Sequence, residues 1–175
     1  MRARFIFVIV LLATVSAARC EELPPGLFDA RIFDVEGKEC TLADWKGKVV
    51  LLHFFAKWCM TCRDDLKALE ELYETFRDRG VVVIGVSSFD SIATLRQYAD
   101  ELKLSFPVLA DTDEMLKKEY TVDALPLTIV FNASGRRVSF PDLKTGELKE
   151  RIEGPQGWNS RAAAEAIEAV LAGSG

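Results

Sequence analysis

The chain has 175 residues, about the length of one domain, and it shows no internal repeat or low-complexity linker. Its 27 acidic residues outnumber its 22 basic residues, which gives a formal net charge of −5 at pH 7. Nucleic-acid binding relies on clustered positive charge, so this composition argues against a nucleic-acid partner. The chain contains 4 cysteines, yet a domain of this size can bury a core without disulfide staples. The cysteines therefore need a chemical explanation as well as a structural one.

Residues 1–19 have the pattern of a secretory signal peptide. Arg2 and Arg4 form a positively charged start, an apolar run follows, and small residues end at Ala18. The run is shorter than the ~20 residues needed to cross a bilayer. An uncleaved anchor stays open as an alternative, and so does lipidation of Cys20. We expect an exported protein, in the periplasm or at the outer face of the cytoplasmic membrane, with a single domain over residues 20–175.

Strands and helices alternate along most of the chain. In order, the patterns predict a hairpin over 31–41, a helical turn over 42–45, a strand over 49–55, a helix over 63–79 closed by Gly80, a strand over 81–87, a helix over 91–102, a short strand over 106–109, a short helix over 113–120 and a strand over 127–131. An elongated hairpin over 136–153 and a helix over 160–172 complete the series. The hairpin is either a plain surface insertion or a partner-contact surface.

This order predicts an α/β sandwich. We expect a central mixed β-sheet between helices, with an N-terminal β-hairpin and an extended C-terminal hairpin.

Two cysteines follow the first buried strand within the segment 58–62, which reads Trp-Cys-Met-Thr-Cys. A helix that begins at Cys59 offers free backbone N–H groups and the positive end of its dipole, and both stabilise a thiolate. Cys62 shares a helix row with Leu66 and Leu69, which turns it toward the core and leaves Cys59 at an exposed tip. The pattern predicts a redox dithiol in which Cys59 is the nucleophile and Cys62 resolves the mixed disulfide.

The other two cysteines leave alternatives open. Cys20 and Cys40 either form a structural disulfide or remain a tail thiol and a loop or strand thiol. Structural zinc needs about four ligands, whereas one C-x-x-C supplies two. His53 is the only histidine, and it lies on the wrong side of the strand entry to be a clear third ligand. We therefore expect no metal and no cofactor, although metal binding or copper delivery is an alternative function.

The motifs resemble the thioredoxin superfamily and, within it, the exported TlpA/ResA-type thiol–disulfide oxidoreductases. A C-x-x-C preceded by Trp and followed far downstream by a Pro-x-Thr strand entry is the most specific part of the resemblance. The matching stretches are 42–48, 49–55, 56–62, 85–87, 106–108, 111–113, 125–128 and 154–158. The resemblance implies a thioredoxin-like fold and an enzyme that exchanges its Cys59–Cys62 pair with protein thiols.

The resemblance also implies roles for residues around the dithiol. Pro126 is expected to be a cis-proline facing the cysteines, and Leu125 to pair through its backbone with an extended substrate peptide. Trp58 is expected to contact substrate as well. His53 is either a proton relay for the resolving thiol or a core histidine with a satisfied ring. Asp90 is either an active-site acid or the N-cap of the helix that follows it.

The expected function is disulfide exchange in an exported protein, as a reductase supplied by a membrane redox donor. The resemblance suggests cytochrome c maturation, with apocytochrome c among the protein substrates, and we expect a monomer. The Met60–Thr61 dipeptide lacks the proline common in thioredoxins, so the direction of electron flow is not inherited from the resemblance. A thiol peroxidase of the peroxiredoxin type is the alternative enzyme, although Ala56 stands where that family expects Thr.

Overall fold

The structure is a computed structural model that describes residues 32–173. The expectations about the signal peptide and about Cys20 fall outside these residues. Cys40 is half-buried and forms no disulfide with any described residue.

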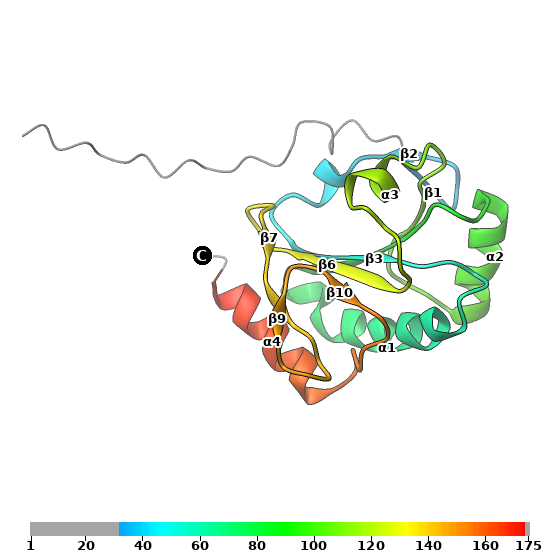
Figure 1. Ribbon diagram of the computed structural model, residues 1–175. Coiled ribbons are helices and arrows are strands. Elements are labelled where there is room, and N and C mark those ends of the chain that lie inside the picture. The colour runs from blue at the N-terminus through cyan, green and yellow to red at the C-terminus, as the bar shows by residue number, and fades with distance from the viewer. Residues whose placement is uncertain (1–31, 174–175) are drawn as a thin grey trace, which may run out of the picture.

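A mixed sheet forms the centre of the fold (Figure 1). Its strands are β1 (Ile32–Asp34), β2 (Glu39–Cys40), β3 (Val49–Phe54), β4 (Val81–Ser87), β5 (Val108–Ala110), β6 (Leu127–Phe131), β7 (Arg137–Val138) and β10 (Ile152–Glu153). The order is β10-β6-β3-β4-β5-β1-β2, with β7 paired to β6. The β3-β4-β5 ladder is parallel and the other pairings are antiparallel. The predicted mixed sheet and its N-terminal hairpin, β1–β2, are both confirmed.

Helices cover the two faces of this sheet (Figure 1). They are the short turn Leu42–Trp45, α1 (Met60–Phe76) with its 3₁₀ extension Arg77–Arg79, α2 (Ile92–Leu102), α3 (Met115–Glu119) and α4 (Arg161–Ala172). Helix α1 begins earlier than residue 63 because Cys59 caps it, and its last turn tightens before Gly80, whose φ is 83°. Among the described residues, none of these helices is long and apolar enough to cross a bilayer.

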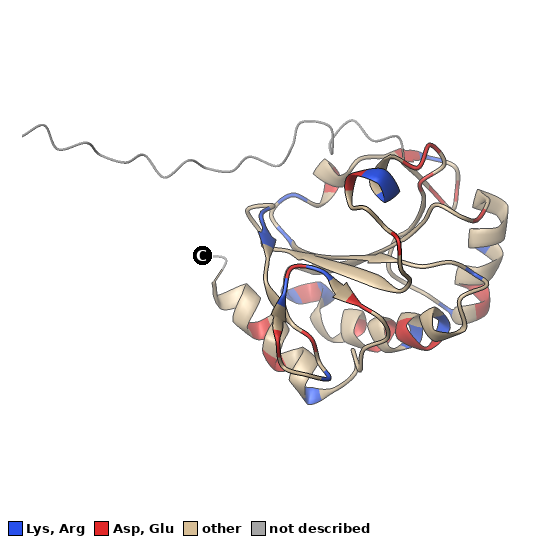
Figure 2. Ribbon diagram, viewed as in Figure 1, with Lys and Arg blue, Asp and Glu red and all other residues tan. Residues whose placement is uncertain are grey.

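The central strands are apolar on both faces, as a covered sheet requires. Charged residues lie on the helices, the loops and the short outer strands, whereas β3, β4 and β6 contain no Lys, Arg, Asp or Glu (Figure 2). Side chains of β3 alternate between two buried clusters: Leu51 joins the cluster that contains Cys62 of α1, and Phe54 joins the opposite one. By the same alternation His53 lies on the α1 face, which is the face that carries the dithiol.

The hairpin predicted over 136–153 forms around the expected turn, but its outer arms do not pair with each other. Strands β7 and β10 both pair with β6, with Val138 opposite Val130 and Ile152 opposite Thr128. Between them, β8 (Phe140–Pro141) and β9 (Leu148–Lys149) leave the sheet as a separate two-stranded ribbon. Proline has no N–H to donate to a ladder, and the departure lets Phe140 pack on Trp158 with ring centroids 5.9 Å apart.

Candidate active site

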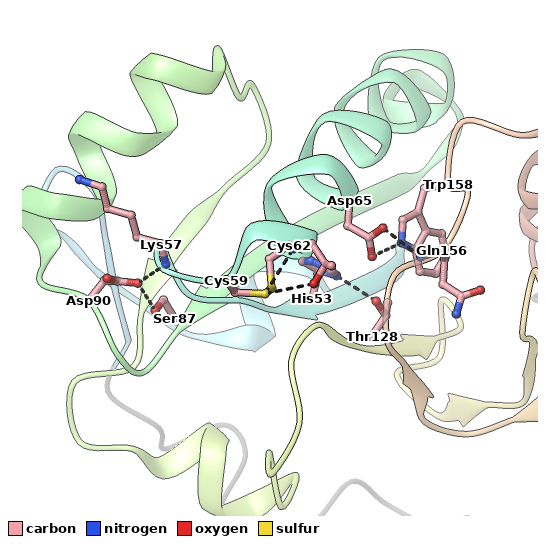
Figure 3. The surroundings of a disulfide bond; sticks show 11 residues. His53, Lys57, Cys59, Cys62, Asp65, Ser87, Asp90, Thr128, Gln156 and Trp158 are labelled. Atoms are coloured by element: carbon pink, nitrogen blue, oxygen red, sulfur yellow. Dashed lines mark hydrogen bonds between the residues drawn. A yellow bond between two sulfur atoms is a disulfide. The ribbon is translucent and has the colours of Figure 1, made fainter.

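Cys59 and Cys62 are joined by a disulfide at the start of α1, just after β3 ends (Figure 3). Cys59 is the N-cap of this helix, and its Sγ accepts the backbone N–H of Cys62 at 3.2 Å. The hydroxyl of Thr61 lies 3.5 Å from the same sulfur. In the reduced protein, these donors and the helix dipole favour a thiolate at Cys59 over one at Cys62.

The two sulfurs differ in accessibility, though less than the sequence predicts. Cys62 is fully buried on the core-facing row of α1, whereas Cys59 keeps 7% of its surface exposed. The expected exposed tip at Cys59 is therefore wrong, because the exposed positions belong to its neighbours Trp58 and Met60, at 68% and 85%. Cys59 thus offers a small accessible surface between two exposed neighbours, whereas Cys62 offers none without a rearrangement.

Asp90 braces the loop that carries the dithiol, and it is not the N-cap of α2. Ser91 is the cap, because its Oγ accepts the backbone N–H of Thr94 at 3.2 Å. Asp90 Oδ2 accepts the backbone N–H of Lys57 and the hydroxyl of Ser87, each at 2.9 Å (Figure 3). The carboxylate thus ties the loop just before Trp58 to the end of β4.

His53 is fully buried between β4 and β6 in the sheet. Its Nδ1 lies 2.9 Å from the hydroxyl of Thr128, and its Nε2 has no hydrogen-bond partner among the described residues. Burial lowers the pKa of His53 to about 3, so the ring is neutral at physiological pH. An imidazole held neutral in this way accepts a proton only weakly, and only one of its two ring nitrogens is satisfied.

Asp65 is a buried acid that the sequence analysis did not single out. It lies three residues after Cys62 on the same face of α1 (Figure 3). One carboxylate oxygen accepts the backbone N–H of Gln156 at 2.9 Å, and the other accepts the indole N–H of Trp158 at 3.3 Å. Burial raises the pKa of Asp65 to about 6, against the opposing effect of these two hydrogen bonds. The available signal was an acidic residue at a position that helical periodicity turns inward.

The loop before β6 faces this end of the sheet. The Leu125–Pro126 peptide bond is cis, the conformation that the resemblance implies. Pro126 is buried, and its carbonyl accepts the backbone N–H of Gly154 at 2.8 Å. Leu125 is half-buried and packs against both core clusters. The geometry fixes the conformation at this position, and a role in substrate binding stays a proposal.

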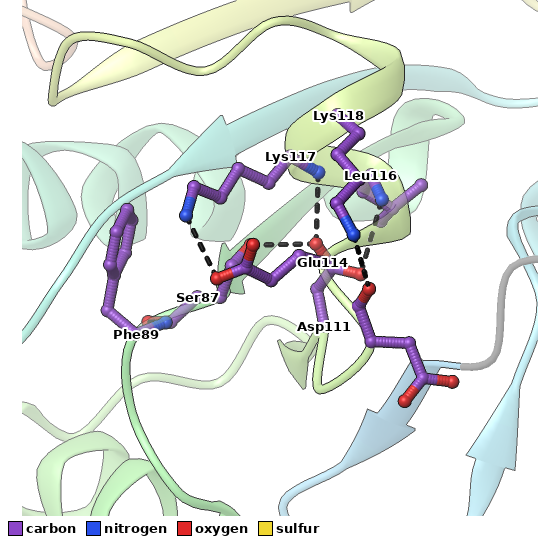
Figure 4. A network of polar contacts seen from close by, with 9 residues as sticks. Ser87, Phe89, Asp111, Glu114, Leu116, Lys117 and Lys118 are labelled. Carbon is purple, nitrogen blue, oxygen red and sulfur yellow. Dashed lines mark hydrogen bonds and ion pairs between the residues drawn. The ribbon is translucent and has the colours of Figure 1, made fainter.

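Aromatic side chains form an exposed rim beside Cys59, and the sequence analysis missed one of them. Phe89 meets Trp58 edge-on, with ring centroids 5.9 Å apart, and is 42% exposed. Lys117 of α3 places its Nζ 4.8 Å from the centre of the Phe89 ring and pairs with Glu114 at 2.9 Å (Figure 4). We call Trp58, Met60 and Phe89 the apolar rim. It contains three of the five large apolar side chains exposed among residues 32–173.

Asp111 fixes the position of α3 behind this rim. Its carboxylate oxygens accept the backbone N–H groups of Leu116 and Lys117 at 3.2 and 3.0 Å, together with the hydroxyl of Ser88 at 2.7 Å. Lys117 is thereby anchored at its backbone and by Glu114 at its side chain, which holds it over Phe89. Among the described residues, no group of three or more His, Cys, Asp or Glu side chains could hold a metal ion.

Comparison with known proteins agrees with this geometry. The AhpC/TSA family matches residues 22–136. The thiol–disulfide oxidoreductase ResA of Bacillus cereus is 27% identical over 163 residues, which are 86% of this chain and 93% of that protein. Among solved structures, the thiol:disulfide interchange protein DsbE of Chlorobium tepidum has a TM-score of 0.64 at 20% identity, over 81% of this chain and 94% of that chain.

A peroxiredoxin shares the same fold. Peroxiredoxin Q of Xanthomonas campestris has a TM-score of 0.60 at 21% identity, over 87% of this chain and 94% of that chain. At this identity the likeness concerns the fold alone. The chemistry of the chain is indicated more specifically by three other findings: the disulfide-linked C-x-x-C at a helix start, the cis-proline and the ResA relatives. The chain belongs to the AhpC/TSA family and is a thiol–disulfide oxidoreductase with a thioredoxin-like fold, similar to ResA and DsbE proteins.

Proposed function

We propose that this oxidoreductase reduces disulfides of exported proteins, with Cys59 as the nucleophile and Cys62 as the resolving thiol. The observation that carries the proposal is the asymmetry of the pair. Cys59 caps α1 and keeps some exposed surface, whereas Cys62 is fully buried behind it. A nucleophile has to meet its partner, and a resolving thiol has to meet only the nucleophile.

The surroundings of Cys59 support the reducing direction. Its sulfur contacts one backbone N–H and one hydroxyl, and the nearby His53 is neutral because its pKa is lowered to about 3. Strong oxidants of this fold class stabilise their reduced form through the thiolate. With neutral donors in these contacts, the disulfide form is less disfavoured, and the dithiol gives up its electrons more readily.

The reaction balances as a two-electron exchange. The Cys59 thiolate attacks a substrate disulfide, which forms a mixed disulfide and releases one substrate thiol after protonation. Cys62 then loses its proton and attacks Cys59 Sγ, which releases the second substrate thiol and leaves the Cys59–Cys62 disulfide. We assign Asp65 as the acceptor of the Cys62 proton, because it is buried on the same helix face and has a pKa raised to about 6.

Substrate contact is assigned to the apolar rim and to the loop before β6. Trp58 and Phe89 present exposed aromatic surface beside Cys59, and apolar patches of this kind serve as contact sites for other chains. Leu125, next to cis-Pro126, is assigned the backbone pairing with an extended peptide. The active-site set is therefore Cys59, Cys62 and Asp65, with Pro126 and Asp90 as shaping residues.

Export is part of the proposal and rests on the signal-like pattern of residues 1–19. In an oxidising compartment the disulfide of a reductase has to be reduced again after each cycle, which requires a redox donor at the membrane. We propose that the mature domain over 20–175 acts as a monomer without a cofactor. Apocytochrome c disulfides are the proposed substrates and its thiols the products, as the resemblance to TlpA/ResA-type proteins suggests.

Trapping in the native host tests the function directly. A Cys62→Ala variant cannot resolve its mixed disulfides, so captured partners stay attached to Cys59. Recovery of apocytochromes supports the maturation role, whereas recovery of many unrelated exported proteins contradicts it in favour of a general role. The Cys59→Ala, Cys62→Ala double variant is the matched control and should capture nothing. Equilibration of the isolated protein with glutathione measures the direction, and a potential above that of the glutathione pool would contradict a reductase.

A thiol peroxidase is the second candidate, favoured by the fold shared with peroxiredoxin Q. Ala56, which stands where the peroxiredoxins of the resemblance have Thr, is fully buried and offers no hydroxyl to a peroxide. Peroxide consumption by the Cys62→Ala variant decides between the two candidates. Rapid turnover there, together with slow exchange with protein disulfides, would favour the peroxidase.

A further inference from the structure

The β8–β9 ribbon and the loop after β10 are joined to the helix that carries the dithiol. The backbone N–H of Leu143 donates to Gln156 Oε1 at 2.8 Å, and the Phe140 ring packs on Trp158. Gln156 and Trp158 then donate to the two carboxylate oxygens of Asp65 (Figure 3). These two donors lie 91 and 93 residues after Asp65 in the sequence. All contacts between this loop and the Asp65 carboxylate are therefore made by neutral donors.

We propose that Gln156 and Trp158 are positioning residues, which the β8–β9 ribbon holds in place so that Asp65 stays buried and fixed on the face of α1 that also carries Cys62. This inference rests on the proposed role of Asp65 as the acceptor of the Cys62 proton. It gives the ribbon a catalytic purpose beyond that of a surface insertion.

Charge distinguishes this arrangement from an ordinary buried ion pair. A lysine or arginine at the carboxylate would hold Asp65 ionised and lower its pKa. A backbone N–H and an indole N–H can donate to a carboxylate and also to the carbonyl oxygen of a carboxylic acid. In the acid form only one of the two oxygens remains a carbonyl, so one donor keeps its acceptor and the other hydrogen bond weakens. These neutral donors thus favour the carboxylate without fixing it in that form, which suits a residue that accepts and returns a proton.

A second aspartate, which lies in the ribbon itself, shows the contrast. Asp142 pairs with Lys149 at 3.1 Å and accepts the backbone N–H groups of Lys144 and Thr145, and these contacts lower its pKa. It is held as an anion and fixes the ribbon turn. The ribbon thus contains one aspartate that is fixed in its charged form. It also supports Asp65 on α1, whose protonation state is free to change.

Two charged groups act on Asp65 through their electrostatic field: Lys144 in the ribbon turn lowers its pKa and Asp64 on α1 raises it. His53, on the sheet face that α1 covers, is neutral. Cys62 is the remaining titratable group on the same helix face, and it does not titrate while it is in the disulfide. In the oxidised protein, a titration near neutral pH in this region therefore reports on Asp65.

The wild-type oxidised protein offers a first test that needs no substitution. The indole N–H resonance of Trp158 in an NMR titration should shift with a midpoint near pH 6, together with the carboxyl carbon of Asp65. The indoles of Trp45 and Trp58 are internal controls and should not follow that midpoint. A Trp158 resonance that stays constant while Asp65 titrates would overturn the proposal.

The second test measures the resolution step. A mixed disulfide between Cys59 and a model peptide is prepared, and the rate of peptide release by Cys62 is followed as a function of pH. In wild-type protein this rate should rise with the titration of Asp65. The Trp158→Phe variant loses one donor to the carboxylate, so the midpoint should move up by about one pH unit, a tenfold change in proton affinity.

Phe140→Leu is the matched control, because it removes ring packing on Trp158 but leaves the indole hydrogen bond. It should lower stability and leave the midpoint unchanged. An unchanged or lowered midpoint in Trp158→Phe overturns the positioning role, provided that Asp65→Asn abolishes the rise. If Asp65→Asn also keeps the wild-type profile, the assigned proton acceptor fails instead. If no peptide is released by the wild-type protein, disulfide exchange itself fails.

Discussion

The pH dependence of stability should reveal the cost of keeping Asp65 buried. Its pKa is about 6 in the folded protein, against an ordinary value of 3.8 for an aspartate in the unfolded chain. A raised folded pKa means that the folded state binds the proton more tightly, so the contribution to stability is present below the unfolded value. It is lost as the pH rises through about 6.

The size of this effect follows from the two pKa values. Linkage gives a loss of about 2 kcal/mol in the free energy of unfolding between about pH 4 and pH 8 from this residue alone. Asp65→Asn should remove that loss, because an amide does not titrate. The quantity to compare is the difference in unfolding free energy between the two pH values, since any fixed cost of the amide cancels in it.

Urea unfolding of the oxidised wild-type and Asp65→Asn proteins at both pH values measures this difference. Asp142→Asn is the control of opposite sign, because the pKa of Asp142 is lowered and its contribution is lost as the pH falls. If Asp65→Asn and wild-type protein lose the same stability between the two pH values, Asp65 is not a dry, protonatable acid, and its assigned role in catalysis loses its basis.

Three further substitutions test the rim, the loop brace and the core. Phe89→Ser should raise KM for a protein disulfide several-fold and leave the rate with a small disulfide unchanged, because a small molecule does not need the rim. Leu148→Ser, which changes an exposed side chain on β9, is the control and should leave both values unchanged. Asp90→Ala should slow reduction of both substrates by loosening the Lys57 loop, and normal rates with both would refute the brace. Gly85→Ala should lower the free energy of unfolding by about 1–3 kcal/mol, because a Cβ there lies 3.1 Å from Phe55 and 3.2 Å from Phe106; an unchanged urea midpoint would contradict this.

Most of the fold was predictable because its signals are local. Strands β4 and β6 have the bounds that their apolar runs indicate, and Ser91 and Ser160 cap the helices that begin after them. The segment 136–153 was predicted less well. Turn residues and an edge proline are compatible with one long hairpin, and only the packing of Phe140 on Trp158 shows that the ribbon leaves the sheet.

In the site, too, the features set by local sequence were predictable and those set by contacts between distant segments were not. The positions of Cys59 and Cys62 follow from a helix start after a buried strand, which is local information. The rim next to Cys59 depends on a contact between Trp58 and Phe89, and Phe89 comes from a different loop. Asp90 was expected to act through charge or as a cap, and its actual contacts are to Lys57 and Ser87. Contacts between segments decide each of these outcomes.

Asp65 shows most clearly why the acid could not be chosen from sequence. Helical periodicity turns it inward, and an inward aspartate is costly unless hydrogen-bond donors meet it. Those donors come from the loop after β10, which reaches α1 only because β7 and β10 share the edge of β6 and release the ribbon between them. The departure from a simple hairpin and the burial of Asp65 thus have the same structural cause. A variant that restored a continuous hairpin by deleting β8 and β9 should therefore lose the pH profile of resolution before it loses the sheet.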